Sequence, residues 1–415
     1  MPSIGHMKTL ISSPGALRIL VISIVARLPL AMLGISLLVH TVHLTGSYAT
    51  AGIVSGVNAV ALGLGGPLLG KLVDRRGQTG VLMLGGCLAG ALLCALAALP
   101  VGSPAAVLVV LAAAIGLAMP PLGACMRSLL PSLVRDASAA PAVYAVETSA
   151  VELTWVVGPP LALGIAALLS TGFALAVAGA VLAGGTALFA AQPASRAWRP
   201  EPGGCRTSGG ALRVPAMQTL VAIFVAIGVL VGGVEVGAAA AASALGSSAA
   251  AGPLLGLWGL GSLAGGILTA RLGGGARGAA GLALVLAGLA TAHVASVAAT
   301  GSLVSLGAVL LVAGAGLAPA FASVYAMVER VAPSGVVTEA FAWLSTAMAL
   351  GGAAGSAAAG ALIEGSGPAA AFALAGGAGV VAVLATVTRA HTLAESPSPR
   401  RTHWHLSRVT FEGVE

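Results

Sequence analysis

The chain has 415 residues, of which 58% are hydrophobic and 7% are charged, with a net charge of +7 and a mean hydropathy of +1.03. Because soluble domains carry about a quarter charged residues, this composition excludes a soluble protein. Apolar runs of roughly 20 residues recur along the chain, long enough to cross a bilayer as helices, and the alternating pattern of membrane-spanning strands is absent. We therefore predict an all-α membrane protein.

Twelve membrane-spanning helices are predicted when the chain is divided at its Gly, Pro, Ser and charge clusters. They cover residues 16–44, 48–70, 80–100, 104–131, 142–169, 172–192, 214–245, 249–271, 279–299, 302–330, 338–364 and 368–389. Gly and Ala fill these segments, which suits the close approach of helices in lipid. The four cysteines have no CxxC spacing, so we expect neither a metal site nor a disulfide framework.

Lysine and arginine mark one side of the predicted membrane. If the N-terminus is cytoplasmic, all of the 19 Lys and Arg residues except Arg27 and Arg127 lie in cytoplasmic segments. The opposite loops contain none. This excess is typical of cytoplasmic loops, so we expect both termini in the cytoplasm and localisation in a bacterial inner membrane. Membrane orientation also explains the positive net charge without a nucleic-acid partner.

An internal repeat appears when the chain is shifted by 200 residues. GSYATAGIVSGVNAVALGLGGPLLGKL (46–72) then aligns with GSSAAAGPLLGLWGLGSLAGGILTARL (246–272), with most glycines in register. Because the shift places span two on span eight, the repeat is parallel, with six spans in each copy. We predict an N-terminal six-helix bundle (1–192), a cytoplasmic linker (193–213), a C-terminal six-helix bundle (214–390) and a disordered cytoplasmic tail (391–415).

The loop between spans two and three resembles a motif of the major facilitator superfamily, GxLaDrxGrkxxl. Its matching positions here are Gly70, Leu72, Asp74, Arg75 and Gly77, while Gln78 and Thr79 stand where basic residues are usual. The resemblance covers nearly the whole chain and implies two pseudo-symmetric halves that transport a small molecule by alternating access. It also implies a gating role for Asp74, which would engage Arg127 or the N-terminal end of span eleven in the outward-facing state.

Span five resembles the Gly-Pro motif of the twelve-span drug-proton antiporters, gxxxGPxxGG. Gly158, Pro159 and, with a shifted spacing, Gly164 support the match, whereas Thr154 stands where a glycine is usual. A third antiporter signature, an arginine followed by a glycine in span four, is absent because Arg127 comes after the glycines. The resemblance implies export of a compound against protons.

Ionisable residues at bilayer depth are costly, so each one is a candidate for function. Arg27 in span one and Glu152 in span five fall near the midplane, and we expect them to pair; Glu147 lies about one and a half turns shallower than Glu152. Burial favours the neutral carboxyl and a nearby arginine favours the charged one, so competition for Arg27 would switch the proton on and off. A static ion pair is the alternative.

The remaining charges lie nearer the ends of their spans. Glu235, toward the outer end of span seven, either guards an external entrance or is a solvated helix end. Arg127 is expected to cap helix carbonyls or to pair with Asp74, and Glu339 to cap the N-terminus of span eleven.

The sequence lacks GxxxxGK[ST], HExxH and GxSxG, so we predict neither an ATP-driven pump nor an enzyme, with no cofactor and no nucleotide partner. The leading hypothesis is a monomeric, proton-driven exporter of a small, fairly apolar compound. One alternative is an uptake symporter in which Arg27 holds an anionic solute. The other is a non-transporting membrane sensor or scaffold.

Overall fold

The computed structural model describes residues 14–133, 140–199, 210–247, 250–276, 278–333 and 335–394, and every regular element in these ranges is helical. Twelve stretches are long and apolar enough to cross a membrane, which confirms the twelve predicted spans. The first six spans are α2 (Pro14–Thr45), α3 (Tyr48–Arg76), α4 (Gln78–Ala97), α5 (Ala105–Ala118) with α6 (Leu122–Leu129), α7 (Ala140–Leu168) and α8 (Thr171–Ala190). The second six are α10 (Pro215–Ala244), α11 (Ala251–Arg271), α12 (Ala279–Ala298), α13 (Leu303–Gly314) with α14 (Leu317–Val331), α15 (Val337–Ser366) and α16 (Pro368–Thr388).

Spans four and ten are each broken into two helices, although the sequence predicts continuous ones. In span four, Pro120 and Pro121 separate α5 from α6, because a proline removes a backbone donor and its ring disfavours the preceding helical turn. In span ten, Ala315 and Gly316 separate α13 from α14. The break in span four matters for function, since Arg127 lies on the short helix α6 that follows it.

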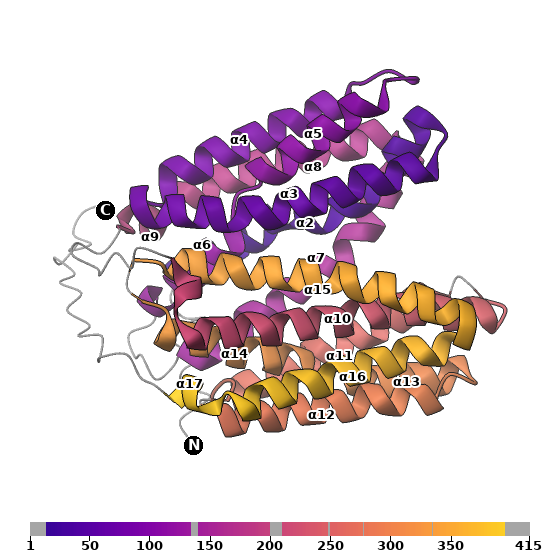
Figure 1. Ribbon diagram of the computed structural model, residues 1–415. Coiled ribbons are helices and arrows are strands. Elements are labelled where there is room, and N and C mark those ends of the chain that lie inside the picture. Colours follow the sequence, from indigo (N-terminus) through magenta and orange to yellow (C-terminus); the bar gives the residue numbers. More distant parts are fainter. Residues whose placement is uncertain are drawn as a thin grey trace.

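The spans form two bundles, α2–α8 and α10–α16, which lie one above the other in Figure 1. Both use the same contacts at positions 200 residues apart. Gly179 of α8 packs on Gly90 of α4, and Gly379 of α16 packs on Ala290 of α12. An ideal Cβ at Gly179 or at Gly379 would lie 2.8 Å from the partner residue. The same helix contact therefore recurs in both bundles at the 200-residue shift predicted from the sequence.

The bundles meet mainly through α3 with α15 and α7 with α11, and the shift of 200 residues exchanges one of these pairs for the other. The helices α7 with α14 and α6 with α15 make further contacts between the bundles. The Thr346 hydroxyl of α15 donates to the Gly63 carbonyl of α3 at 2.7 Å, and Gly266 of α11 packs against Ser149 of α7. We call the end where α3 finishes at Arg76 and α11 at Arg271 the basic end. The bundles meet along this end and diverge toward the opposite one (Figure 1).

The predicted linker and tail are partly described. The linker contains α9 (Pro193–Ala197) and the 3-10 turn η3 (Ala211–Arg213), while residues 200–209 lie outside the described ranges. The sequence predicts a disordered tail from residue 391, but the first residues of that tail are helical and belong to α17 (Ala390–Ala394). Its Thr392 hydroxyl lies 3.0 Å from the Thr219 hydroxyl of α10, and both residues are buried. The rest of the predicted tail, 395–415, falls outside the described residues.

Candidate functional site

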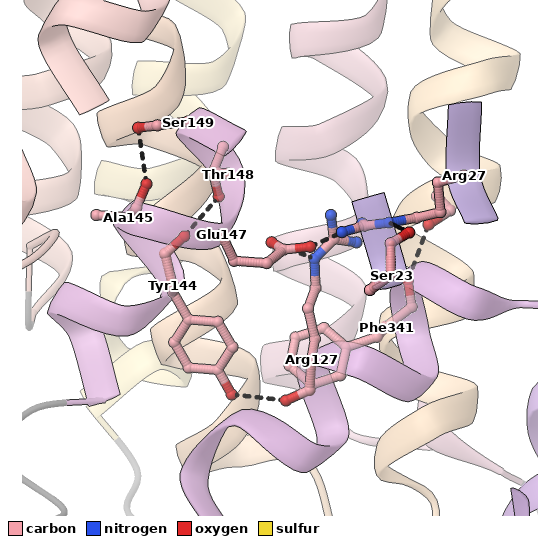
Figure 2. A network of polar contacts seen from close by, with 10 residues as sticks. Ser23, Arg27, Arg127, Tyr144, Ala145, Glu147, Thr148, Ser149 and Phe341 are labelled. Carbon is pink, nitrogen blue, oxygen red and sulfur yellow. Dashed lines mark hydrogen bonds and ion pairs between the residues drawn. The ribbon is translucent and has the colours of Figure 1, made fainter. Parts of the chain in front are cut away.

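Three charged side chains from three helices meet inside the first bundle (Figure 2). Arg27 Nη1 of α2 lies 2.7 Å from Glu147 Oε1 of α7, and Arg127 Nε of α6 lies 3.2 Å from Glu147 Oε2. Glu147 is fully buried and both arginines are nearly so. We call these three residues the ion cluster. Since burying an unpaired charge at this depth is costly, mutual pairing is what allows all three to be there.

The ion cluster also touches the second bundle. The guanidinium carbon of Arg127 lies 4.0 Å from the ring centroid of Tyr325 in α14, a cation–π geometry. Tyr144 of α7 donates from its hydroxyl to the Arg127 carbonyl at 3.2 Å, and its ring lies 6.0 Å from that of Phe341 in α15. Arg127 of the first bundle is therefore in direct contact with an aromatic side chain of the second, Tyr325.

Small residues allow these helices to come close enough for the charges to pair. An ideal Cβ at Gly158 of α7 would lie 2.7 Å from the Cβ of Ala31 in α2, so the glycine lets the two backbones approach. An ideal Cβ at Gly123 of α6 would lie 3.3 Å from Arg27 Nη1. Within the Gly-Pro motif, Pro159 continues α7 without interrupting it, and Gly164 faces open space.

The predicted pairing of Arg27 with Glu152 is wrong, since Glu147 takes that place. Five residues along a helix correspond to a rotation of about 140°, so the two glutamates point in different directions from α7. Glu147 faces α2 and α6, whereas Glu152 lies beside Ser262 of α11, at the junction with the second bundle. Depth along the span favoured Glu152, but the rotation of α7 turns Glu147 toward Arg27 instead.

Asp74 lies at the basic end and binds the N-terminus of α15. Its Oδ1 accepts from the Thr338 amide at 3.1 Å and its Oδ2 from the Glu339 amide at 2.8 Å. These amides have no partner within their own helix, and a carboxylate there also compensates the helix dipole. Two partners were possible for Asp74, Arg127 and the N-terminal end of span eleven. In the structure Asp74 binds the end of span eleven.

Two related predictions need correction. Arg127 pairs with Glu147 and not with Asp74, because Asp74 is already held by α15 at the end of α3. The carboxylate of Glu339 does not cap its own helix; its Oε1 accepts from the Ala211 amide of the linker at 3.4 Å. The cap of α15 comes instead from the other bundle, which sequence spacing alone does not reveal.

The other residues of the gating motif shape the corner between α3 and α4. Gly70 packs against α15, where an ideal Cβ would lie 3.1 Å from the Cβ of Ala342. Gly77 ends α3 and starts α4 with φ +91°, a conformation that favours glycine. Leu72 is half-buried and Arg75 is exposed. The motif therefore fixes a sharp corner that presents Asp74 to α15.

Gln78, which departs from the family motif, makes buried hydrogen bonds that the sequence does not predict. Its side chain is buried, its Nε2 donates to the Cys125 carbonyl at 3.2 Å, and its Oε1 accepts from the Ser195 hydroxyl at 3.1 Å. A charged residue would be costly in that environment. Tyr325 and Tyr144 were also missed, because contact with a buried arginine leaves no local pattern.

The remaining candidates stand apart from the ion cluster. Glu235 is exposed near the end of α10 away from the basic end and forms no ion pair with any described residue. Its role stays a prediction. His293 is fully buried in the second bundle, where its Nε2 accepts from Trp258 Nε1 at 3.2 Å, an arrangement typical of a structural histidine. Within the described ranges no three His, Cys, Asp or Glu side chains gather as metal ligands would.

Comparison with solved structures finds the same fold in transporters. The human organic anion transporter MFSD10 (TETRAN) has a TM-score of 0.68 at 17% identity, covering 90% of this chain and 99% of that one. A bacterial homologue of the iron transporter ferroportin in its outward-facing state has a TM-score of 0.68 at 16% identity, covering 89% and 98%. The proton:xylose symporter XylE has a TM-score of 0.66 at 16% identity, covering 88% and 94%.

These identities are too low to transfer a substrate or a direction of transport, so the structural likeness speaks for the fold. No curated protein matches this chain in sequence. A family model described as Major Facilitator Superfamily, however, matches residues 19–334, well over half of the chain. Together with the twelve spans and the two related bundles, this match shows that the chain belongs to the major facilitator superfamily of transporters.

Proposed function

We propose that the protein is a proton-coupled secondary transporter that exports a small, fairly apolar compound by alternating access. The observation that carries the proposal is the ion cluster: a fully buried glutamate held by two arginines, one of which touches the opposite bundle. A protonatable group in this position is able to change how the two bundles meet.

Glu147 is the residue proposed to carry the proton. In the charged form its two oxygens hold Arg27 and Arg127 from different helices. A proton on the carboxyl removes that charge and leaves two buried cations side by side, which repel each other and favour rearrangement. Arg127 is the arginine whose movement reaches α14, through Tyr325. Protonation would thereby change the contact between the bundles.

The two bundles are proposed to rock about this site. In the described conformation, Asp74 joins α3 to α15 at the basic end, and the bundles diverge at the other end (Figure 1). If the lysines and arginines of that end face the cytoplasm, as in most membrane proteins, the conformation is closed inward and the Asp74 contact is the inner gate. Opening would require α15 to release Asp74.

Export is the proposed direction. It is supported by the Gly-Pro motif, whose Gly158 forms the close contact between α7 and α2 that brings Glu147 to Arg27. This contact ties the motif of the antiporters to the ion cluster. The apolar composition of the spans also favours a fairly apolar substrate over a sugar-like one.

Uptake of a small anion together with protons is the second candidate function, and one observation favours it. Two arginines and one glutamate leave the ion cluster with one surplus positive charge, and Arg27 Nη2 is buried without a hydrogen-bond partner. An anionic solute would neutralise the surplus charge and accept a hydrogen bond from Arg27 Nη2. Because an anion displaces the Glu147 carboxylate and so favours its protonation, solute and proton would bind together and move in the same direction.

Transport assays in proteoliposomes separate the two candidates. The full chain is reconstituted, a pH gradient is imposed, and two compound panels are tested: neutral or cationic lipophilic compounds and small organic anions. Movement against the proton flow supports export, and movement with it supports anion uptake. A glutamine at Glu147 should abolish the pH-driven component, whereas Glu364→Gln, at an exposed end of α15, should not. Absence of flux in every arm contradicts both candidates and favours a non-transporting membrane protein.

A further inference from the structure

A groove of about 630 Å³ runs along the outer face of the first bundle, between α3, α4 and α5. Leucines from all three helices line it, among them Leu69, Leu84, Leu88 and Leu117. Its one charged lining residue is Arg76, at the end of α3. The groove is separate from the ion cluster, which lies among α2, α6 and α7.

The length of the groove matches one leaflet of a bilayer. Along α4 its lining runs from Gly80 to Leu92, about 18 Å at 1.5 Å per residue. One half of a hydrocarbon core of about 30 Å is about 15 Å. The groove thus begins at the basic end, where α4 starts, and finishes near the middle of the membrane. An acyl chain of a phospholipid in that leaflet has this reach.

The charge around the groove selects the headgroup. Arg76 is exposed at its mouth, whereas Lys71 and Arg75, in the last two turns of the same helix, do not line the groove. The acid of this segment, Asp74, is buried and bound to α15, so it does not offset the arginine at the surface. A cationic mouth above an apolar groove complements a phosphate joined to an acyl chain.

We propose that this groove binds one anionic phospholipid, with an acyl chain between α3 and α4 and its phosphate at Arg76. The acyl chain of the lipid packs on Leu69 and Leu72. These residues flank Gly70 in the sequence, where α3 contacts α15. The lipid therefore supports the same corner that presents Asp74 to the other bundle. This site does not depend on the direction of transport or on the substrate.

Two substitutions separate headgroup from acyl chain. Arg76→Gln removes the charge and leaves the groove open. Gly80→Phe is designed to fill the groove and leave the charge. The position Cβ would take at Gly80 has no atom within 4 Å and its backbone is helical, so a side chain can be attached there without backbone strain. Arg75→Gln is the matched control, because Arg75 is also exposed in the same helical turn but does not line the groove.

The measurement is the thermal stability of the purified full chain in detergent, titrated with phosphatidylglycerol or phosphatidylethanolamine of identical acyl chains. We expect phosphatidylglycerol to raise the Tm of the unmodified protein and of Arg75→Gln more than phosphatidylethanolamine does. Arg76→Gln should lose this difference, and Gly80→Phe should lose most of the response to both lipids. Native mass spectrometry should show one retained phosphatidylglycerol in the unmodified protein and none in Gly80→Phe.

Equal responses to the two lipids in the unmodified protein would overturn the proposal, as would an Arg76→Gln protein that keeps the full phosphatidylglycerol effect. If Gly80→Phe instead leaves lipid binding intact but slows entry of an apolar compound, the groove is a lateral path for that compound and not a lipid site. The unliganded Tm of each variant shows whether it is folded before any lipid is added.

Discussion

Glu147 and Arg127 lie 20 positions apart in the sequence and on different helices, α7 and α6, yet the carboxylate Oε2 and the guanidinium Nε come within 3.2 Å inside the bundle. With Arg27 on the other oxygen, the cluster holds two positive charges and one negative charge. This imbalance of charge predicts which variants of these residues are the less stable.

Glu147→Gln should destabilise the protein more than Arg27→Gln does. The first change leaves two buried cations and no anion, whereas the second leaves a neutral Arg127–Glu147 pair. Removing one partner of a buried pair costs about 3–5 kcal/mol. The double variant Arg27→Gln/Glu147→Gln should recover part of the loss, a non-additivity measured by comparing the Tm of all four proteins. Additive effects would show that the charges do not depend on one another.

Tyr325 should matter for transport through its ring rather than its hydroxyl. Tyr325→Phe keeps the aromatic face under Arg127, and Tyr325→Leu removes it. Cation–π contacts contribute about 0.5–2 kcal/mol, so the leucine variant should fold but transport more slowly, while the phenylalanine variant stays close to normal. Initial rates in proteoliposomes measure the difference. Equal rates in the two variants would contradict a role for this contact.

Asp74→Asn should impair transport while leaving membrane insertion and orientation intact. Asparagine keeps one side-chain acceptor for the Thr338 and Glu339 amides, but it loses the second acceptor and the negative charge that favours a helix N-terminus. Transport rate is measured beside the topology of the inserted protein. A variant that transports normally would show that the charge of Asp74 is dispensable for the gate.

Gly274→Ala should weaken the contact between the bundles, and Gly273→Ala provides its control. Both glycines have φ +100°, so alanine is strained by on the order of 1–3 kcal/mol at either position. The methyl group at Gly273 meets open space, whereas at Gly274 it collides with the backbone of Pro141 at the start of α7. Only Gly274→Ala should therefore change transport beyond the shared loss in Tm. Equal transport by the two variants would rule out a role for this contact.

Gly274 is also the residue that the 200-residue repeat places on Asp74. Asp74 caps α15 with its carboxylate, while Gly274 packs against the start of α7 without a side chain. The two halves thus share a fold but not a gate, and the carboxylate contact is one-sided.

Much of this protein is determined by its sequence alone. Hydropathy and helix length dictate the twelve spans, because a bilayer leaves the backbone no alternative to internal hydrogen bonding. The repeat and the glycine positions dictate two related bundles, since close helix contacts require small residues at fixed spacing. The motif around Asp74 identified one side of the contact between the bundles before any partner was visible.

Only the tertiary structure decided which charges meet. The estimated depth of Arg27 favours Glu152, yet the rotation of α7 brings Glu147 to the arginine and turns Glu152 toward α11. The break at Pro120 and Pro121 places Arg127 on a separate short helix, where it reaches Glu147 and Tyr325 instead of Asp74. Periodicity along one helix says nothing about its rotation against another. That angle is set by packing of the whole bundle, so the ion cluster emerges only in three dimensions.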